Sequence, residues 1–138
     1  MNHPLRKIAL VVVLAASVLP LTLPSIAKAD PAPTTVRISE KAQFISPMQI
    51  NLEVTLSCNA GGFFAVSAMV AQPQPALFVP PTTGTGFTSG GCTGQQEKLV
   101  VSVFTFFVFP GWQLGDAVAS VAACLPCAVD TREIRIVL

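Results

Sequence analysis

Two cysteines three residues apart, Cys124 and Cys127, form the motif in this sequence that could carry redox chemistry. A redox-active Cys-x-x-Cys motif normally begins a helix beside a βαβ unit, where the helix dipole lowers the pKa of the first thiol. Here the motif lies at a corner between two predicted strands, and the nearest basic residue, Arg132, follows five residues later. We therefore expect a structural disulfide, with a thiol-redox protein as the alternative.

Other side chains that could catalyse a reaction or bind a metal are scarce. The single histidine, His3, lies close to the N-terminus, so serines such as Ser57 and Ser102 have no histidine to act as a base. Structural zinc needs four ligands, and only Cys58 and Cys92 could complete the Cys-x-x-Cys pair. The carboxylates show no paired spacing, and no glycine-rich stretch leads into a phosphate-binding lysine. We predict no enzymatic activity, no metal and no cofactor.

Residues 1–29 have the three parts of a cleavable signal peptide. The basic pair Arg6-Lys7 precedes an apolar run from Ile8 to Leu23, and Ala27-Lys28-Ala29 places small residues where signal peptidase cleaves. A retained membrane anchor is the alternative, but this run of 16 residues falls short of the roughly 20 that span a bilayer as a helix. We predict a signal-peptide helix, a mature chain from Asp30 that is secreted, periplasmic or in the cell envelope, and no stable membrane span after cleavage.

The predicted mature chain is small and slightly acidic. Cleavage leaves 109 residues, which suit one domain, with five basic and seven acidic side chains and a net charge of −2. Such a chain has no long-range attraction for a polyanion, so we expect no nucleic-acid partner.

Apolar and polar residues alternate along much of the mature chain, which is typical of half-buried β-strands. The segment from Gln49 to Cys58 places five apolar residues on one face and five polar residues on the other. An Asn-Ala-Gly-Gly turn then predicts a hairpin with a second strand from Phe63 to Ala71. Further strands are expected over Leu99 to Phe109, Asp116 to Cys124 and Ala128 to Leu138.

Two stretches rich in proline interrupt this pattern. Residues 30–35 form a Pro-rich leader, and the four prolines between Gln72 and Gly91 predict an irregular edge or crossover with a short strand near Phe87. Six or seven short strands without a helix in residues 36–138 predict an immunoglobulin-like antiparallel β-sandwich. A small closed β-barrel is the alternative.

Both folds bury one face of each strand, so they predict the same core. We expect Trp112, which follows the Pro110-Gly111 corner, to plug one end of it. The inward residues of the strands are Ile50, Leu52, Val54, Leu56, Phe64, Val66, Leu99, Val101, Val103, Ala117, Ala119, Val121, Ile134 and Ile136.

The order of four short motifs supplies a further comparison. A strand ending in Cys58 is followed by Cys92-Thr93-Gly94, the corner Trp112-Gln113-Leu114-Gly115 and an alanine-rich strand reaching Cys124-Leu125-Pro126-Cys127. This order resembles small secreted bacterial proteins with an immunoglobulin-like, two-disulfide domain of unassigned activity. Four cysteines allow three pairings, and the resemblance implies Cys58–Cys92 and Cys124–Cys127. The chain departs from the pattern at Phe104 to Phe109, where a Thr-rich strand is expected.

That apolar run, Leu99 to Phe109, is the candidate binding segment. At 11 residues it is too short for a membrane helix. If alternate residues from Leu99 face the core, the others point outward, where a half-exposed sheet should be polar. Either the loop from Gln72 to Pro81 covers them, or they form an exposed patch for a partner or an apolar ligand. The candidate patch comprises Val100, Phe104, Phe106, Phe107 and Phe109.

Three functional hypotheses follow from these observations. The first is an exported, non-enzymatic binding or structural domain that acts through a sheet face on a protein partner. The second is a small carrier of an apolar ligand, and the third is the thiol-redox protein that uses Cys124 and Cys127. A flat aromatic patch favours the first, whereas a concave pocket of a few hundred Å³ favours the second.

Overall fold

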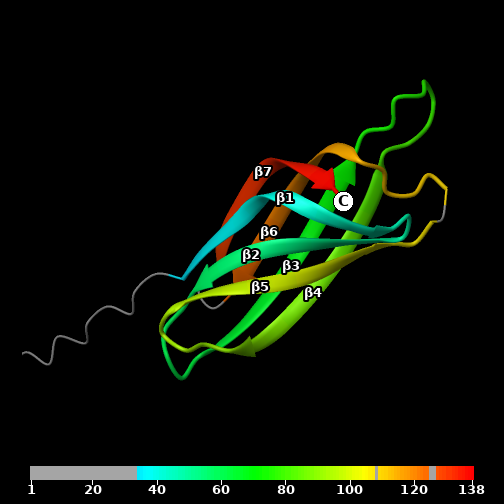
Figure 1. Ribbon diagram of the computed structural model, residues 1–138. Helices are drawn as coiled ribbons and strands as arrows, with labels where there is room; N and C mark the ends of the chain where they lie inside the picture. Colours follow the sequence, from blue (N-terminus) through cyan, green and yellow to red (C-terminus); the bar gives the residue numbers. More distant parts are fainter. Residues whose placement is uncertain (1–33, 108, 125–126) are drawn as a thin grey trace, which may run out of the picture.

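Seven β-strands close into a barrel in the computed structural model, which describes residues 34–107, 109–124 and 127–138 (Figure 1). The order around the barrel is β1-β2-β5-β4-β3-β6-β7, and the described residues contain no helix. All neighbours are antiparallel except β1 and β7, which are parallel. The predicted signal peptide and most of the Pro-rich leader lie outside the described residues. The strands are β1 (Thr35–Ser46), β2 (Gln49–Ser57), β3 (Phe63–Gln72), β4 (Thr82–Gly91), β5 (Gln96–Thr105), β6 (Gly115–Cys124) and β7 (Ala128–Val137).

The predicted immunoglobulin-like sandwich is wrong, and the alternative small barrel is correct. Strands that a sandwich would leave in separate sheets are joined here by two short stretches of strand pairing, which we call seams. At one seam the pairing of β1 with β2 is interrupted between Ile38 and Ala42, and residues 41–43 of β1 pair with residues 135–137 of β7. At the other seam β4 and β5 pair at only two positions, Gly84 with Thr105 and Thr85 with Phe104.

Glycine explains why β4 can approach β5. A Cβ atom on Gly84 would lie 2.6 Å from the ring of Trp112 and 2.7 Å from the carbonyl oxygen of Phe104. A Cβ atom on Gly86 would overlap the carbonyl oxygen of Ser102. A larger residue at either position would therefore push the two strands apart and open this seam.

Strand pairing departs from the prediction in a second way. The expected hairpin of β2 with β3 does not form, because β2 pairs with β1 and β5 whereas β3 pairs with β4 and β6. The turn at residues 59–62, with Gly61 at a φ of +83°, leads the chain across the barrel end instead.

Two strands were missed or shortened in the sequence prediction. The sequence pattern does not predict β1, since Glu40 interrupts the apolar residues at alternate positions between Val36 and Phe44. The predicted irregular stretch from Gln72 to Gly91 contains the ten-residue strand β4, whose start at Thr82 follows the last proline. The expected short strand near Phe87 is the middle of β4.

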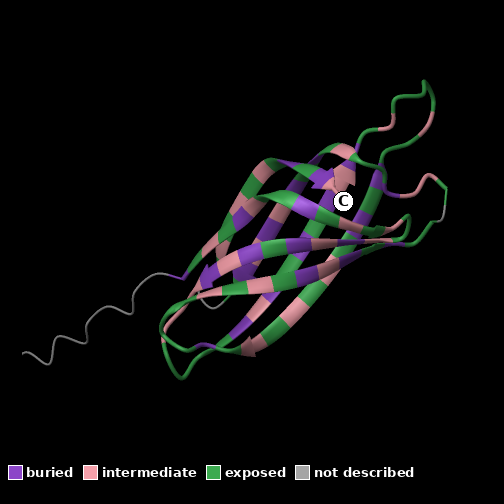
Figure 2. Cartoon of the chain, viewed as in Figure 1, coloured by how far each residue is buried: buried purple, intermediate pink, exposed green. Residues whose placement is uncertain are grey.

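The core agrees with the prediction, as the alternation of buried and exposed residues along the strands shows (Figure 2). All the predicted inward residues are buried except Leu99, which is partly buried against the core. Trp112 is only 2% exposed and closes one end of the barrel. Side chains therefore fill the interior of this barrel.

Two disulfides join the pairs that the resemblance implied. Cys58 and Cys92 link the residue after β2 to the residue after β4, with their Cα atoms 5.6 Å apart. Backbone hydrogen bonds from Gly61 N to Cys92 O (3.2 Å) and from Cys92 N to Gly62 O (2.8 Å) support this link. The second disulfide joins Cys124 to Cys127 between β6 and β7. Both are at the end of the barrel opposite to Trp112.

Candidate functional site

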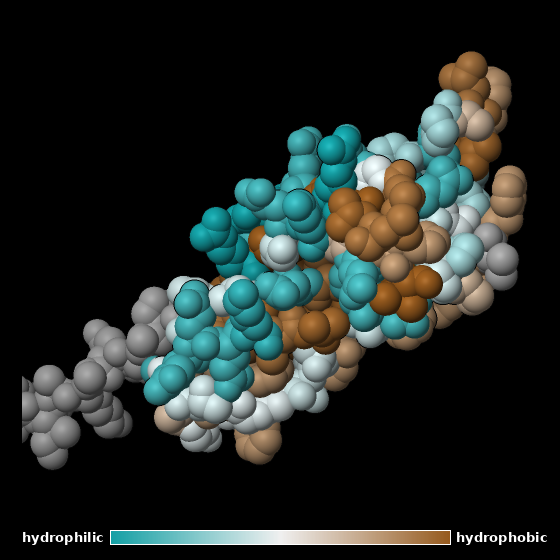
Figure 3. Space-filling model, in the orientation of Figure 1, coloured by the Kyte–Doolittle hydropathy of each residue, from teal (hydrophilic) through white to brown (hydrophobic). Residues whose placement is uncertain are grey.

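Exposed apolar side chains gather at the Trp112 end of the barrel. Three connections meet there, the β1–β2 turn (47–48), the β3–β4 loop (73–81) and the β5–β6 loop (106–114), as seen on the right of Figure 1. Figure 3 shows hydrophobic side chains on the β3–β4 loop, which projects furthest at the upper right. We call this region the apolar end and define it by Met48, Leu77, Phe78, Phe106, Phe107, Phe109 and Leu114, all of which are exposed.

Exposure is greatest at the tips of the two longer loops. Leu77 is 87% exposed, Phe78 102%, Phe106 82% and Phe109 86%. Phe78 also has a positive φ of 68°, the left-handed conformation that residues with a bulky side chain rarely adopt. The backbone at this tip therefore holds an aromatic ring fully in solvent, in a conformation that costs about 1–2 kcal/mol.

The three connections contain no charged residue. Their sequences consist of apolar residues, glycine, proline and glutamine, with no Asp, Glu, Lys, Arg or His. An ion pair between Arg135 and Asp116, with 3.5 Å between nitrogen and oxygen, lies at the start of β6 just below the β5–β6 loop. This surface therefore does not attract a partner by electrostatic interactions.

A buried polar layer beneath the apolar end holds the loops in place. The side chain of Gln72, 4% exposed, accepts a hydrogen bond from the backbone N of Gln113 (3.0 Å) and donates one to its O (2.8 Å). The hydroxyl of Thr82, 2% exposed, lies 3.1 Å from the carbonyl oxygen of Pro110 and 3.2 Å from that of Gly111. The β5–β6 loop is thereby bonded to both ends of the β3–β4 loop.

The β1–β2 turn is fixed to the same loop. The backbone N of Trp112 donates to the carbonyl oxygen of Pro47 (2.7 Å), and the backbone N of Thr105 donates to that of Met48 (3.0 Å). All three connections are thus tied together below their exposed tips. The tips project from a base with a fixed geometry.

The structure divides the predicted patch between two places. Val100 and Phe104 lie on the outer face of β5, 60% and 50% exposed, whereas Phe106, Phe107 and Phe109 follow the end of that strand and belong to the apolar end. The predicted strand to Phe109 therefore ends early, at Thr105. Phe104 pairs with Gln49 next to the loops, but Val100 pairs with Glu53 in mid-barrel.

The alternative that the β3–β4 loop covers these rings is wrong, because every ring of the predicted patch is at least half exposed, and Leu77 and Phe78 in that loop are exposed as well. Both residues belong to the stretch from Gln72 to Pro81, which the sequence pattern indicates only as a cover for the patch. Their signal was an apolar pair flanked by prolines on both sides, which predicts a loop but not its direction.

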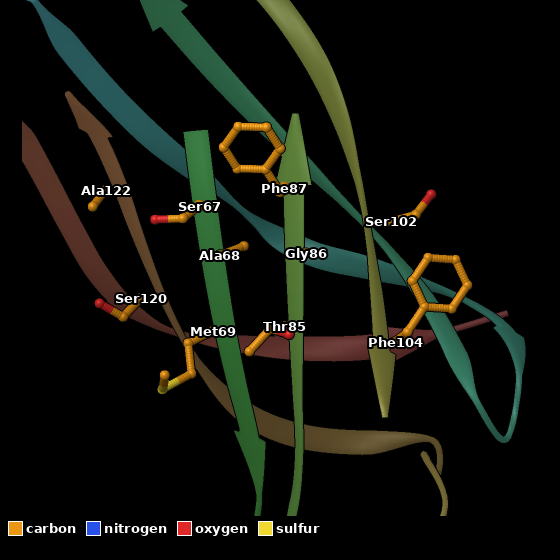
Figure 4. Close-up of a pocket in the computed structure, with 10 residues that line it drawn as sticks. All are labelled: Ser67, Ala68, Met69, Thr85, Gly86, Phe87, Ser102, Phe104, Ser120 and Ala122. Atoms are coloured by element: carbon orange, nitrogen blue, oxygen red, sulfur yellow. The ribbon is translucent and has the colours of Figure 1, made fainter. Parts of the chain in front are cut away.

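A shallow groove lies on the outside of the barrel over β6, β3, β4 and β5, with a volume of about 660 Å³ and a wide opening to solvent (Figure 4). Its large side chains, Met69, Phe87 and Phe104, come from three different strands. Phe104 joins the groove to the apolar end. The remaining lining residues are small: Ser67, Ala68, Thr85, Gly86, Ser102, Ser120 and Ala122.

Charged side chains gather on β1, β6 and β7 around a second depression that is widely open to solvent and is lined by Glu40, Asp116, Arg132, Glu133, Ile134 and Arg135. Within residues 34–107, 109–124 and 127–138, no group of three or more His, Cys, Asp or Glu side chains could hold a metal ion. Three carboxylates form ion pairs, Glu53 with Lys98 (3.7 Å), Asp116 with Arg135, and Asp130 with Arg132 (3.3 Å). No helix among the same residues is long and apolar enough to cross a membrane.

Comparisons with known proteins add little to this description. No protein-family model matches the chain, and no curated protein matches it. Among solved structures, the chain is similar to the crystal structure of DesR, a β-glucosidase from Streptomyces venezuelae in complex with D-glucose, with a TM-score of 0.43 and 16% identity. The similarity covers 73% of this chain and 15% of that chain. At this TM-score the similarity supports no conclusion about fold or activity.

Proposed function

We propose that this chain is an exported, non-enzymatic binding domain that contacts its partner through the apolar end. The observation that supports this proposal is the group of aromatic side chains left uncovered on loops that are hydrogen-bonded to one another below. Phe106, Phe107 and Phe109 come from the predicted patch, and Phe104 extends the same surface onto the outer face of β5.

Energetics favour a partner for this surface. Burying one phenylalanine side chain contributes roughly 1.5–3 kcal/mol, so several exposed rings favour association. The hydrogen bonds of Gln72 and Thr82 already order the loops, which lowers the entropic cost of binding. With a predicted net charge of −2, the mature chain has little electrostatic repulsion against association.

Export and the absence of catalysis are parts of the same proposal. Two disulfides are typical of an oxidising compartment outside the cytosol, which agrees with the predicted signal peptide. The lone histidine of the sequence falls within that signal peptide, and the three paired carboxylates have structural partners. Cys124 and Cys127 connect two strands, β6 and β7, rather than begin a helix that would stabilise a thiolate, which supports a structural role for their disulfide.

Changing Phe104 and Phe106 to threonine tests this proposal. Threonine keeps the β preference of the strand position and removes apolar area. Because both rings are at least half exposed, we expect the free energy of unfolding to stay within about 0.5 kcal/mol. Self-association, or binding to the isolated cell envelope, should fall at least about tenfold, since two rings are removed from the contact.

Urea unfolding and sedimentation provide the two measurements. Phe63→Thr is the matched control, because Phe63 is 76% exposed at the opposite end of the barrel and should affect neither quantity. A loss of several kcal/mol in stability without a change in association would show that Phe104 and Phe106 are ordinary packing residues.

A carrier of an apolar ligand is the second candidate function, and the groove beside Phe87 and Phe104 is the observation that favours it. Its volume suits a small apolar molecule, although its wide opening leaves much of such a molecule in solvent. Native mass spectrometry of the purified protein separates the two functions, since a carrier retains a bound small molecule and a partner-binding domain does not.

A further inference from the structure

We infer that the apolar end docks onto an uncharged lipid surface. This inference rests on the proposed function and names the partner that the apolar end fits. The described strands remain in water, and only the loop tips enter the interface between lipid headgroups and acyl chains.

The shape of the apolar end supports a fluid partner. Its most exposed rings stand on two separate loops, with Phe78 on the β3–β4 loop and Phe106, Phe107 and Phe109 on the β5–β6 loop. The β3–β4 loop projects beyond the rest of the molecule (Figure 3). A folded protein would need a pocket shaped for each tip, whereas lipid chains adapt to tips of any shape.

Backbone hydrogen bonding in the loops also fits a lipid environment, where each unpaired N–H group is costly. Six prolines, which have no N–H to satisfy, occupy the three connections at positions 47, 73, 75, 80, 81 and 110. The N–H of Val79 donates to the carbonyl of Ala76 (3.4 Å), and that of Phe107 donates to the hydroxyl of Thr105 (3.4 Å). The prolines and these two hydrogen bonds lower the number of unpaired donors that the loops present to the lipid, and the N–H groups of Leu77 and Phe78 are the ones left at the tip.

The lack of charge in the three connections indicates which class of lipid the apolar end contacts. Because the three connections contain no basic residue, they offer nothing to an anionic headgroup. The nearest ion pair, Arg135 with Asp116, limits how deeply the barrel can enter, since charged groups are costly below the headgroups. Attachment should therefore depend on apolar contact, require no anionic lipid, and change little with salt.

Flotation with phosphatidylcholine vesicles tests the inference, using protein purified after expression of the full chain. We expect the protein to float with the vesicles at both low and high salt. The double variant Phe78→Asn/Phe107→Ser should lose at least about tenfold in partitioning, because two rings leave the interface. Asparagine tolerates the positive φ at position 78, so folding should not suffer.

The matched control is Phe63→Thr/Val129→Thr, which removes two exposed apolar side chains at the opposite end of the barrel, outside the groove, and should float like the wild type. Trp112, the single tryptophan, provides a second readout. Brominated phosphatidylcholine should quench its fluorescence, because it lies directly beneath the loops. Flotation without quenching would place another surface on the bilayer and overturn the inference.

Other outcomes overturn the lipid inference but leave the proposed function intact. One is binding that needs anionic lipid and disappears with salt while still depending on the tip residues. Another is a dimer, seen without vesicles, that the Phe78→Asn/Phe107→Ser variant abolishes. A third is absence of flotation together with tip-dependent cross-linking to an envelope protein. If the tip variant matches the wild type in every assay, the inference and the proposed function both fail.

Discussion

Replacing Trp112 with alanine is expected to lower the free energy of unfolding by about 3–5 kcal/mol. The side chain is 2% exposed and fills the barrel end against Gly84, where even one added Cβ atom would lie 2.6 Å from its ring. Hydrogen bonds between the neighbouring loops limit how far these loops can collapse into the space that the indole leaves. Urea unfolding measures the loss.

The same change should loosen the apolar end. The backbone N of Trp112 donates to the carbonyl oxygen of Pro47 in the β1–β2 turn, and we expect this bond to open more often once the buried indole is removed. We expect amide hydrogen exchange in residues 106–114 to accelerate more than exchange in β6 and β7. Trp112→Phe is the control and should lose much less stability, since it retains most of the apolar volume. A loss below about 1 kcal/mol in the alanine variant would mean that Trp112 does not anchor this end.

Removing the Cys58–Cys92 disulfide, by changing both residues to alanine, is expected to cost about 3.8 kcal/mol. The two cysteines are 34 residues apart, and the crosslink lowers the entropy of the unfolded chain by closing that loop. Thermal and urea unfolding of the double variant measure the loss.

The second disulfide supplies the internal comparison. Cys124 and Cys127 are separated by only three positions, so the same relation gives about 1.9 kcal/mol for their removal. We therefore expect removal of the Cys58–Cys92 disulfide to lower the free energy of unfolding more than removal of the Cys124–Cys127 disulfide. Equal losses, or the reverse ranking, would show that the Cys124–Cys127 disulfide stabilises the native β6–β7 corner directly rather than through the unfolded chain.

The core was predictable because period-two alternation assigns residues to faces without any knowledge of pairing. Ile50, Leu52, Val54 and Leu56 needed only the rule that alternate side chains of a strand point the same way. The choice between sandwich and barrel depended on two seams, one closed by three residue pairs and the other by two. So few residue pairs leave no pattern in the sequence, and nothing in the sequence marks Gly84 and Gly86 as the place where two strands approach closely.

The candidate site was predictable in part for a similar reason. The run that ends at Phe109 contains more apolar residues than one buried face can use, so an exposed patch was a sound hypothesis. The sequence pattern carries no information on the direction of the β3–β4 loop, so it does not predict the exposure of Leu77 and Phe78. Their exposure depends on the buried side chains of Gln72 and Thr82, which bond to a loop about 30 to 40 residues away.

The sparse pairing between β4 and β5 has a mechanical consequence. Two residue pairs next to Trp112 hold β4 and β5 together at one end of the barrel. The Cys58–Cys92 disulfide holds them together at the other end, because Cys92 follows β4 and Cys58 follows β2, the neighbour of β5. Two strands that are held together at both ends can move apart in the middle without separating completely. After reduction of the disulfide, β4 and β5 are held together only at the Trp112 end. Under tension the barrel then opens first at the far end, and the apolar end is the last part to lose its shape.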